Sequence, residues 1–252
     1  MYATYKLHRL VPVSTIILVH GAWQGAWCWN KLAPLLRTAG HQVHTPDLPG
    51  HGNNPLPAKL VNTAVYVKAI SELVESQHDQ VILVGHSMGG MVITQVAEQL
   101  PDRVARLVYI SGFLLENGQS INDLEPQVTH SSLAGKLLLS GDKSSLIIPE
   151  SIIQEAFYSD CTEEDYRFAL TRFQAQPVQP FLTPAQHSEA RFGSVPRVYI
   201  ECLFDRAIPV QAQRFMHQSL HCAKIVTLEC AHSPFYSVYN KLADVLLDVS
   251  TR

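Results

Sequence analysis

Short, continuous apolar runs alternate along this chain with stretches in which apolar residues recur every third or fourth position. The short runs indicate strands that are buried on both faces of a sheet, and the longer spacing indicates amphipathic helices. The expected strands, in chain order, are residues 15–20, 41–45, 80–84, 104–110, 197–202 and 224–228. Because helical stretches separate them, the pattern predicts the α/β class, with a mostly parallel sheet covered by helices on both faces.

The intervals between these strands carry the expected helices. Asn62 or Thr63 is suited to cap the second helix, because a side-chain oxygen at the N-cap accepts a hydrogen bond from a free backbone N–H. The expected helical ranges are 26–37, 63–77, 88–100, 211–220 and 233–249.

Residues 112–195 break this alternation. They contain no run typical of a buried strand, but they contain two helix-like pieces, residues 149–158 and 162–175. Thr162 followed by Asp165 fits a capping box at the start of the second piece. We therefore expect one α/β core, residues 1–111 and 196–252, that carries a helical lid, residues 112–195. The lid should cover the carboxyl ends of the strands, where open α/β sheets bind ligands.

The charge and length of the chain indicate which kind of molecule it binds. The chain has 252 residues, a net charge of −3 and 16% charged residues, without a Lys/Arg run. The electrostatic footprint of a nucleic-acid-binding protein is therefore missing, and we expect a small substrate that is not strongly anionic.

The cysteines and the first residues bear on the compartment. Five cysteines are scattered without a C-x-x-C pair, and an odd count favours free thiols in a reducing cytoplasm. Residues 1–13 lack the sustained apolar run of a signal peptide, and residues 16–19 are too short a run to cross a bilayer. We therefore expect a soluble, cytoplasmic protein without a membrane partner.

The sharpest chemical signal is the sequence GHSMG at residues 85–89, placed between an expected strand and an expected helix. In that context G-x-S-x-G forms a sharp turn that lifts the serine hydroxyl above the sheet. Ser87 is therefore the expected nucleophile. The Met88 N–H, at the start of the helix, is an expected oxyanion-hole donor.

A serine hydroxyl is a poor nucleophile until a base takes its proton. In this type of fold the acid and then the histidine follow the serine, each in a loop after a later strand. Asp205 follows the fifth expected strand and His232 follows the sixth, so we expect them to be the acid and the general base. Asp102 and Asp123 are alternative acids, although neither follows a strand as well.

The loop after the first strand should supply the second oxyanion donor. It reads His20, Gly21, Ala22 and Trp23, and the Ala22 N–H is the expected donor. Gly21 would let the backbone approach the serine, His20 would hold the loop, and Trp23 would line the substrate pocket.

Two His-x₂₋₃-His pairs, one on a strand and the other (His217 with His221) on a surface helix, lack the further ligand that zinc needs, so we expect no metal and no cofactor.

Five segments together resemble one branch of a known family. HGAWQGAWCW, PDLPGHG, GHSMGG, DRAIP and AHSPF are similar to the esterase and hydroxynitrile-lyase branch of the α/β-hydrolases. That branch includes plant methyl salicylate and methyl jasmonate esterases and bacterial arylesterases. The resemblance runs from Thr15 to the C-terminus and is loosest in residues 112–191. It implies an α/β-hydrolase fold and a serine hydrolase, and homodimers are common in the branch.

The resemblance also raises alternatives. Plant lyases of this type carry a threonine and a cyanide-stabilising lysine where this chain has Gly21 and Ser233, so the lyase is disfavoured. Haloalkane dehalogenases and epoxide hydrolases use an aspartate where this chain has Ser87. Non-catalytic hormone receptors sometimes have damaged triads, whereas this triad is whole. A serine-dependent C–C bond hydrolase or a tailoring step on an aromatic polyketide would use the same three residues and stays open.

The expected reaction is hydrolysis of a small carboxylic ester through an acyl-enzyme, with an apolar or aromatic acyl or alcohol group. Aromatic residues of the lid are candidates for the pocket, although aromatic residues at helical spacing are just as often part of a core. The candidates beside Trp23 are Phe157, Tyr158, Phe168, Phe173 and Phe181.

Overall fold

The computed structural model describes residues 13–127 and 130–250. The stretch 1–13, for which no signal peptide is expected, lies outside the described residues apart from Val13. No helix in these two ranges is long and apolar enough to span a bilayer.

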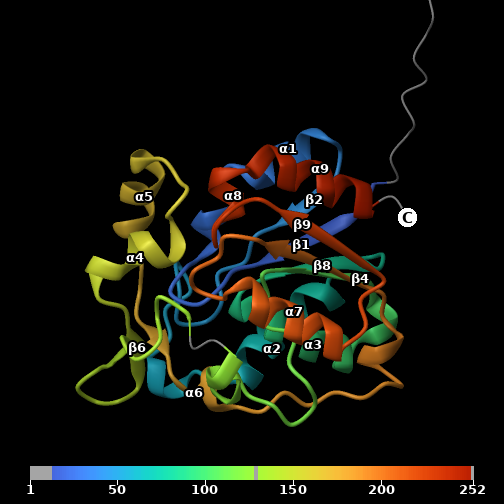
Figure 1. The fold of residues 1–252 in the computed structure, drawn as a ribbon. Coiled ribbons are helices and arrows are strands. Elements are labelled where there is room, and N and C mark those ends of the chain that lie inside the picture. The colour runs from blue at the N-terminus through green and yellow to red at the C-terminus, as the bar shows by residue number, and fades with distance from the viewer. Residues whose placement is uncertain (1–12, 128–129, 251–252) are drawn as a thin grey trace, which may run out of the picture.

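A six-stranded sheet forms the centre of the molecule (Figure 1). Its strands are β1 (Thr15–Val19), β2 (Gln42–His44), β3 (Val81–His86), β4 (Val104–Ile110), β8 (Arg197–Cys202) and β9 (Lys224–Leu228). They lie in the order β2-β1-β3-β4-β8-β9, and every neighbouring pair is parallel. The predicted parallel sheet is confirmed, and all six strands lie where the sequence pattern put them. The chain passes from β1 outward to β2 and then back across β1 to β3. Open α/β sheets bind ligands at such a switch point, outside the carboxyl ends of the strands.

Helices cover both faces of this sheet. One face carries α1 (Leu32–Thr38), α8 (Pro234–Ser237) and α9 (Tyr239–Ser250), and the other carries α2 (Thr63–Glu75), α3 (Met88–Gln99) and α7 (Val210–Ser219), as Figure 1 shows. Asn62 caps α2, since its side chain accepts a hydrogen bond from Val65 N. The helix expected over 233–249 is interrupted, because Val238 leaves the helical region at φ −133°.

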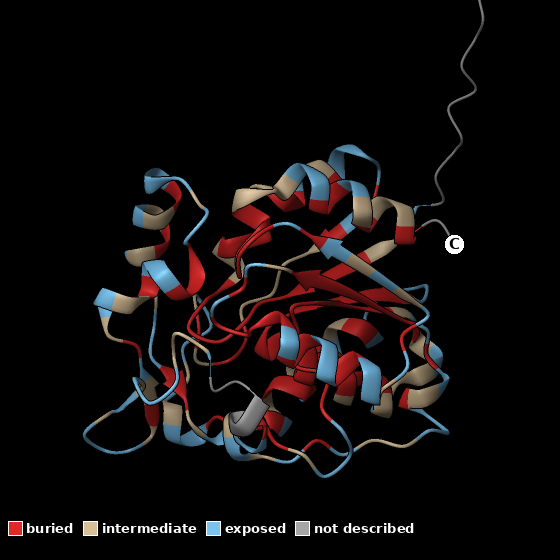
Figure 2. Cartoon of the chain, viewed as in Figure 1, coloured by how far each residue is buried: buried red, intermediate tan, exposed pale blue. Residues whose placement is uncertain are grey.

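Burial follows the layers. Every residue of β3 is buried, and the helices are buried on their sheet-facing sides and exposed outside, as Figure 2 shows. The edge strand β9 alternates between partly buried and exposed positions along most of its length, because successive side chains of a strand point to opposite faces of the sheet. The strand that leads to the candidate nucleophile is thus completely buried.

The chain leaves the sheet between β4 and β8 to form the lid. It contains α4 (Glu150–Phe157), α5 (Glu163–Leu170) and α6 (Gln179–Leu182). Thr162 caps α5 as expected, since its Oγ1 accepts a hydrogen bond from Asp165 N at 3.2 Å. The prediction of a helical lid was incomplete, because β5 (Leu138–Leu139), β6 (Ser145–Ile147) and β7 (Gln176–Pro177) form a small antiparallel sheet. Strands of two or three residues are too short to produce an alternating pattern that sequence reasoning can detect.

Candidate active site

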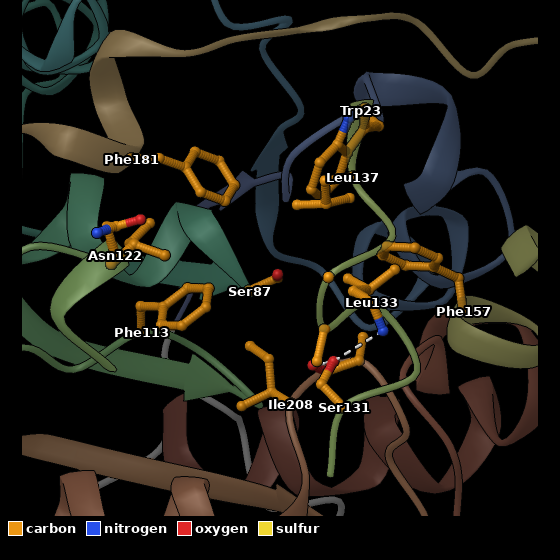
Figure 3. A pocket seen from close by; sticks show the side chains of 14 residues that line it. Trp23, Ser87, Phe113, Asn122, Ser131, Leu133, Leu137, Phe157, Phe181 and Ile208 are labelled. Carbon is orange, nitrogen blue, oxygen red and sulfur yellow. Dashed lines mark hydrogen bonds between the residues drawn. The ribbon is translucent and has the colours of Figure 1, made fainter. Parts of the chain in front are cut away.

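Ser87 lies in the tight turn between β3 and α3. Its backbone has φ 51° and ψ −123°, a region that non-glycine residues adopt only at a cost of about 1–3 kcal/mol. Three hydrogen bonds hold the turn: Ser87 N donates to Ile110 O (3.2 Å), and Ser87 O accepts from Gly90 N (3.0 Å) and Phe113 N (2.9 Å). The strained turn directs the hydroxyl into a cavity (Figure 3).

The two glycines of the motif are required by close packing around this turn. A Cβ on Gly85 would lie 2.6 Å from Gly89 O, and a Cβ on Gly89 would lie 2.5 Å from Val19 O. Helix α3 therefore begins in direct contact with the end of β1. This contact explains why G-x-S-x-G needs glycine at both flanks.

Asp205 and His232 are in direct contact. His232 Nδ1 donates to Asp205 Oδ2 at 2.7 Å, and Asp205 Oδ1 accepts from the backbone N–H groups of Ala207 and Ile208, each at 2.8 Å. His232 Nε2 is buried and has no hydrogen-bond partner within the described ranges of the chain. With its Nδ1 proton committed to Asp205, the imidazole presents the Nε2 lone pair, as a general base must.

His86 ties the histidine loop to the serine turn, and sequence reasoning did not single it out. Burial lowers the pKa of His86 far below its ordinary value, so the ring is neutral. Its Nε2 donates to His232 O at 2.8 Å, and the two imidazole rings lie 4.5 Å apart. The residue just before Ser87 thus supports the backbone of His232.

Ser111 is a further contact of the triad that sequence reasoning missed. It directly follows β4, is fully buried, and adopts φ 40°. Its hydroxyl donates to Asp205 Oδ2, the same oxygen that accepts from His232 Nδ1, and its N–H donates to Ile200 O at 2.9 Å. The only signal in the sequence is position, since a residue directly after β4 lies at the same sheet edge as the residues after β3 and β8.

We expect Ser111→Ala to lower kcat for ester hydrolysis about ten- to a hundredfold with little change in KM, because a hydrogen bond to a charged group contributes about 1.5–3 kcal/mol. The change removes one of the two donors to Asp205 Oδ2 and leaves the substrate cavity intact. Steady-state kinetics would measure it, with Ser120→Ala as the control. The Ser120 hydroxyl bonds to Asp123, away from the triad, so a similar loss in both variants would contradict the role given to Ser111.

Among the described residues, no acceptor competes for the backbone N–H groups expected in the oxyanion hole. Met88 is the first residue of α3, and its N–H has no intrahelical partner. Within the described ranges no backbone acceptor pairs with Ala22 N–H. A Cβ on Gly21 would lie 2.9 Å from Ser87 Cβ, so the loop that carries Ala22 lies directly against the nucleophile.

His20 holds this loop rather than facing the cavity. Burial lowers the pKa of His20 to about 4, so the ring is neutral. Its Nδ1 donates to Gly21 O at 2.8 Å, and its Nε2 accepts from Leu48 N at 3.0 Å. The structural role expected for His20 agrees with these bonds.

A cavity of about 290 Å³ adjoins Ser87. Among the described residues that line it, none carries a charge. Figure 3 shows Ser87 in the middle, with aromatic rings from the core and the lid around it. The lining residues besides Ser87 are Trp23, Phe113, Ile121, Asn122, Ser131, Leu133, Ala134, Gly135, Leu137, Phe157, Phe181, Ala207 and Ile208.

Only part of the expected aromatic lining faces this cavity. Trp23, Phe157 and Phe181 line it, whereas Tyr158, Phe168 and Phe173 do not. Tyr158 is fully buried and its hydroxyl accepts from Gln24 Nε2, and the other two rings pack against Trp27. The pocket assignment of these three residues is corrected: they join the lid to the core, a packing role that helical spacing does not distinguish from pocket lining.

One further expectation needs correction. His217 was expected on a surface helix, but it is buried and bonds to Glu201 Oε1 at 2.8 Å. A polar pair therefore lies between α7 and β8, which a pattern of apolar positions does not reveal.

Comparison with known proteins identifies the family to which this fold and site correspond. Residues 16–245 match the Alpha/beta hydrolase family. A putative chloroplastic methylesterase 11 of Arabidopsis thaliana is 32% identical over 93% of the chain, which spans 63% of that relative's length. An alpha-hydroxynitrile lyase of the same plant is 30% identical, with 93% of this chain and 96% of the lyase covered. The crystal structure of a pyrethroid hydrolase from Sphingobium faniae superposes with a TM-score of 0.85 at 30% identity, covering 94% of this chain and 97% of that one. The chain belongs to the Alpha/beta hydrolase family.

Proposed function

We propose that this protein is a serine carboxylesterase that hydrolyses small, uncharged esters with apolar or aromatic groups. One observation carries the proposal: the imidazole of His232 is held by Asp205 through Nδ1 and keeps Nε2 unpartnered, and His86 joins it to the turn of a strained serine that opens into an apolar cavity. An esterase and a pyrethroid hydrolase among the similar proteins support the same chemistry.

The reaction has two steps. His232 Nε2 takes the Ser87 proton as Oγ attacks the ester carbonyl, and the N–H groups of Ala22 and Met88 stabilise the oxyanion. The alcohol leaves with the proton from His232, and water then cleaves the acyl-enzyme by the reverse route. Asp205 keeps the Nδ1–H tautomer throughout, and two backbone donors fix its carboxylate.

The cavity favours neutral substrates of modest size. Its volume of about 290 Å³ lies just below the range for ligand pockets, about 300–1,000 Å³. A charged substrate group would lose its hydration there without a compensating partner. Phe113, Phe157 and Phe181 supply ring faces and edges for an apolar acyl or alcohol group.

The lyase alternative is weaker on two observations. A Cβ on Gly21 would lie 2.9 Å from both the His86 ring and Ser87 Cβ, so a threonine there would require this loop to shift. Ser233 is fully buried and offers no cation beside His232. A departing cyanide would therefore lack the local positive charge that stabilises it.

We expect the purified protein to hydrolyse p-nitrophenyl acetate, p-nitrophenyl butyrate and methyl salicylate, and to leave racemic mandelonitrile at the background rate. Release of alcohol, phenol or cyanide would be followed directly, with heat-inactivated protein as the blank. Cyanide release well above background would overturn the esterase assignment in favour of the lyase. Labelling of Ser87 by a fluorophosphonate without hydrolysis of any of these esters would favour a C–C bond hydrolase or a polyketide-tailoring enzyme instead.

The cysteines support a reducing compartment for this enzyme. All five are free thiols, and four of them are buried. Free thiols are typical of the cytoplasm, where we place the protein. The homodimer that the family resemblance implies stays an expectation.

A further inference from the structure

The side chain of Gln176 is fully buried although it belongs to the lid strand β7. Its Oε1 accepts from Trp23 N (3.4 Å) and pairs with His51 Nε2 (3.0 Å), and its Nε2 donates to Tyr66 Oη (3.1 Å) and Pro177 O (3.0 Å). Because an amide oxygen can only accept, His51 Nε2 carries the proton and donates to it. A buried amide with all four of its hydrogen bonds made is a fixed anchor.

Trp23 is tied to the lid at three atoms. Its N–H donates to Gln176 Oε1, its carbonyl accepts from Gln174 N (3.1 Å), and its indole Nε1 donates to Leu146 O (2.9 Å). Its backbone has φ 61°, a left-handed conformation that a tryptophan keeps only when its surroundings enforce it. The lid contacts supply that enforcement.

The same loop contains the candidate oxyanion donor. Ala22 N–H belongs to the peptide unit whose carbonyl is Gly21 O, and His20 Nδ1 holds that carbonyl at 2.8 Å. The next peptide unit carries Trp23 N–H, which Gln176 holds. The two anchors are themselves joined, since the rings of His20 and His51 lie 5.2 Å apart and His51 bonds to Gln176.

We propose that Gln176 is a positioning residue for the oxyanion hole: from the lid, its side-chain oxygen fixes the peptide after Ala22 and so aims the Ala22 N–H at the oxygen that forms on Ser87. The proposal rests on the serine esterase function proposed above. It makes β7 a fixed part of the catalytic centre, because opening this strand would release the oxyanion loop.

Gln176 also joins the lid to α2 through Tyr66, so a structural role must be separated from a positioning role. Tyr66→Phe removes only the hydroxyl that accepts from Gln176 Nε2 and leaves the bond to Trp23. Gln174→Ala is the matched control on the same segment, because its side chain accepts from Gly52 N while its main chain keeps the bond to Trp23 O. Gln176→Met removes the oxygen opposite Trp23 N–H, and Gln176→Glu keeps an oxygen there.

The test combines turnover of p-nitrophenyl butyrate with the inhibition constant Ki of butylboronic acid. Ser87 Oγ adds to the boron atom as its proton passes to His232, which gives a tetrahedral anion with one oxygen in the oxyanion hole. Each variant would be measured well below its own melting temperature. Such a measurement separates the geometry of the hole from global stability, because the folded fraction is then close to one.

We expect Gln176→Met to lower kcat and to raise the boronate Ki by a similar factor of about 10–100, with KM unchanged within about twofold, since losing an oxyanion donor outright costs about 10²–10³ in turnover. Gln176→Glu should recover most of both effects. Tyr66→Phe and Gln174→Ala should have a melting temperature that is unchanged or lower. Their kcat and boronate Ki should stay within about twofold of the wild-type values, as is usual for a substitution away from the site.

Unchanged kcat and Ki in Gln176→Met, or a rise in KM alone, would overturn the positioning role. An equal loss in Tyr66→Phe would overturn it as well, because the effect would then come from the lid–α2 contact. If Gln176→Met does not fold, Gln176→Glu decides: because it keeps an oxygen opposite Trp23 N–H, a boronate Ki about 10–100-fold above the wild-type value would contradict the proposal. Failure of the esterase function would show in the wild type instead, as absent ester turnover, and the dissociation constant of butylboronic acid, measured by titration calorimetry, would then compare the variants.

Discussion

Replacing Ser87 with alanine is expected to lower kcat for ester hydrolysis by about 10⁶-fold, the loss that follows removal of the nucleophile from a serine hydrolase triad. Stability should hardly change. The side chain points into the cavity, and the turn is held by backbone hydrogen bonds that alanine keeps. Alanine is also no more strained than serine at φ 51°. Turnover of p-nitrophenyl butyrate and a thermal melt of each protein would measure the two expectations.

The double variant Ser87→Ala/His232→Ala tests whether Ser87 and His232 act as one catalytic unit. Residues that act as one unit are not additive, so the second substitution should cost little more than the first. Ser233→Ala is the matched control, since it alters a buried hydroxyl next to His232 that has no partner in the described parts of the chain. If Ser87→Ala kept more than about a hundredth of the activity, a loss far smaller than removal of a nucleophile causes, the nucleophile would lie elsewhere.

The core of the fold could be predicted because its strands are buried on both faces. Strand β3 is apolar over nearly its whole length, and such a run has few readings other than a central parallel strand. The candidate triad followed from the same logic. Parallel strands end at one edge of a sheet, so a serine, an aspartate and a histidine that each directly follow a strand must gather there. No contact had to be known in advance.

The residues that complete the site could not be found this way. Ser111 acts through a hydroxyl on Asp205, and a serine after a strand has no distinguishing neighbours in sequence. Gln176 lies in a strand of two residues, too short for any periodicity, and its partners come from three distant segments. Contacts of this kind depend on tertiary packing alone.

The sequence pattern also could not tell which aromatic residues line the pocket. Phe157 and Tyr158 are adjacent at the end of α4, yet the first lines the cavity and the second packs in the lid–core junction. Phe113 and Ile208, which also line the cavity, lie in loops after β4 and β8 and carry no spacing signal. Which rings face a substrate is decided by how the lid docks.

Replacing Asp205 with asparagine is expected to lower kcat about 10⁴-fold, because the hydrogen bonds around residue 205 would then favour the wrong tautomer of His232. The backbone N–H groups of Ala207 and Ile208 both donate to Oδ1, so an asparagine must place its carbonyl oxygen there. Its NH₂ group then faces His232 Nδ1. A donor at that position favours the tautomer that carries its proton on Nε2, and this tautomer cannot accept the proton of Ser87.

The loss from Asp205→Asn should therefore appear in kcat with KM little changed, and labelling of Ser87 by a fluorophosphonate should slow in parallel. Asp102→Asn and Asp123→Asn are the controls for the two other carboxylates considered from the sequence. Asp102 precedes β4, at the opposite end of the strands from the site, and Asp123 is exposed and bonded to Ser120. Both controls should stay within about twofold of the wild type, as is usual for surface substitutions. A large loss in either one, with Asp205→Asn active, would move the triad acid to that carboxylate and break the link between strand ends and catalysis on which the site assignment depends.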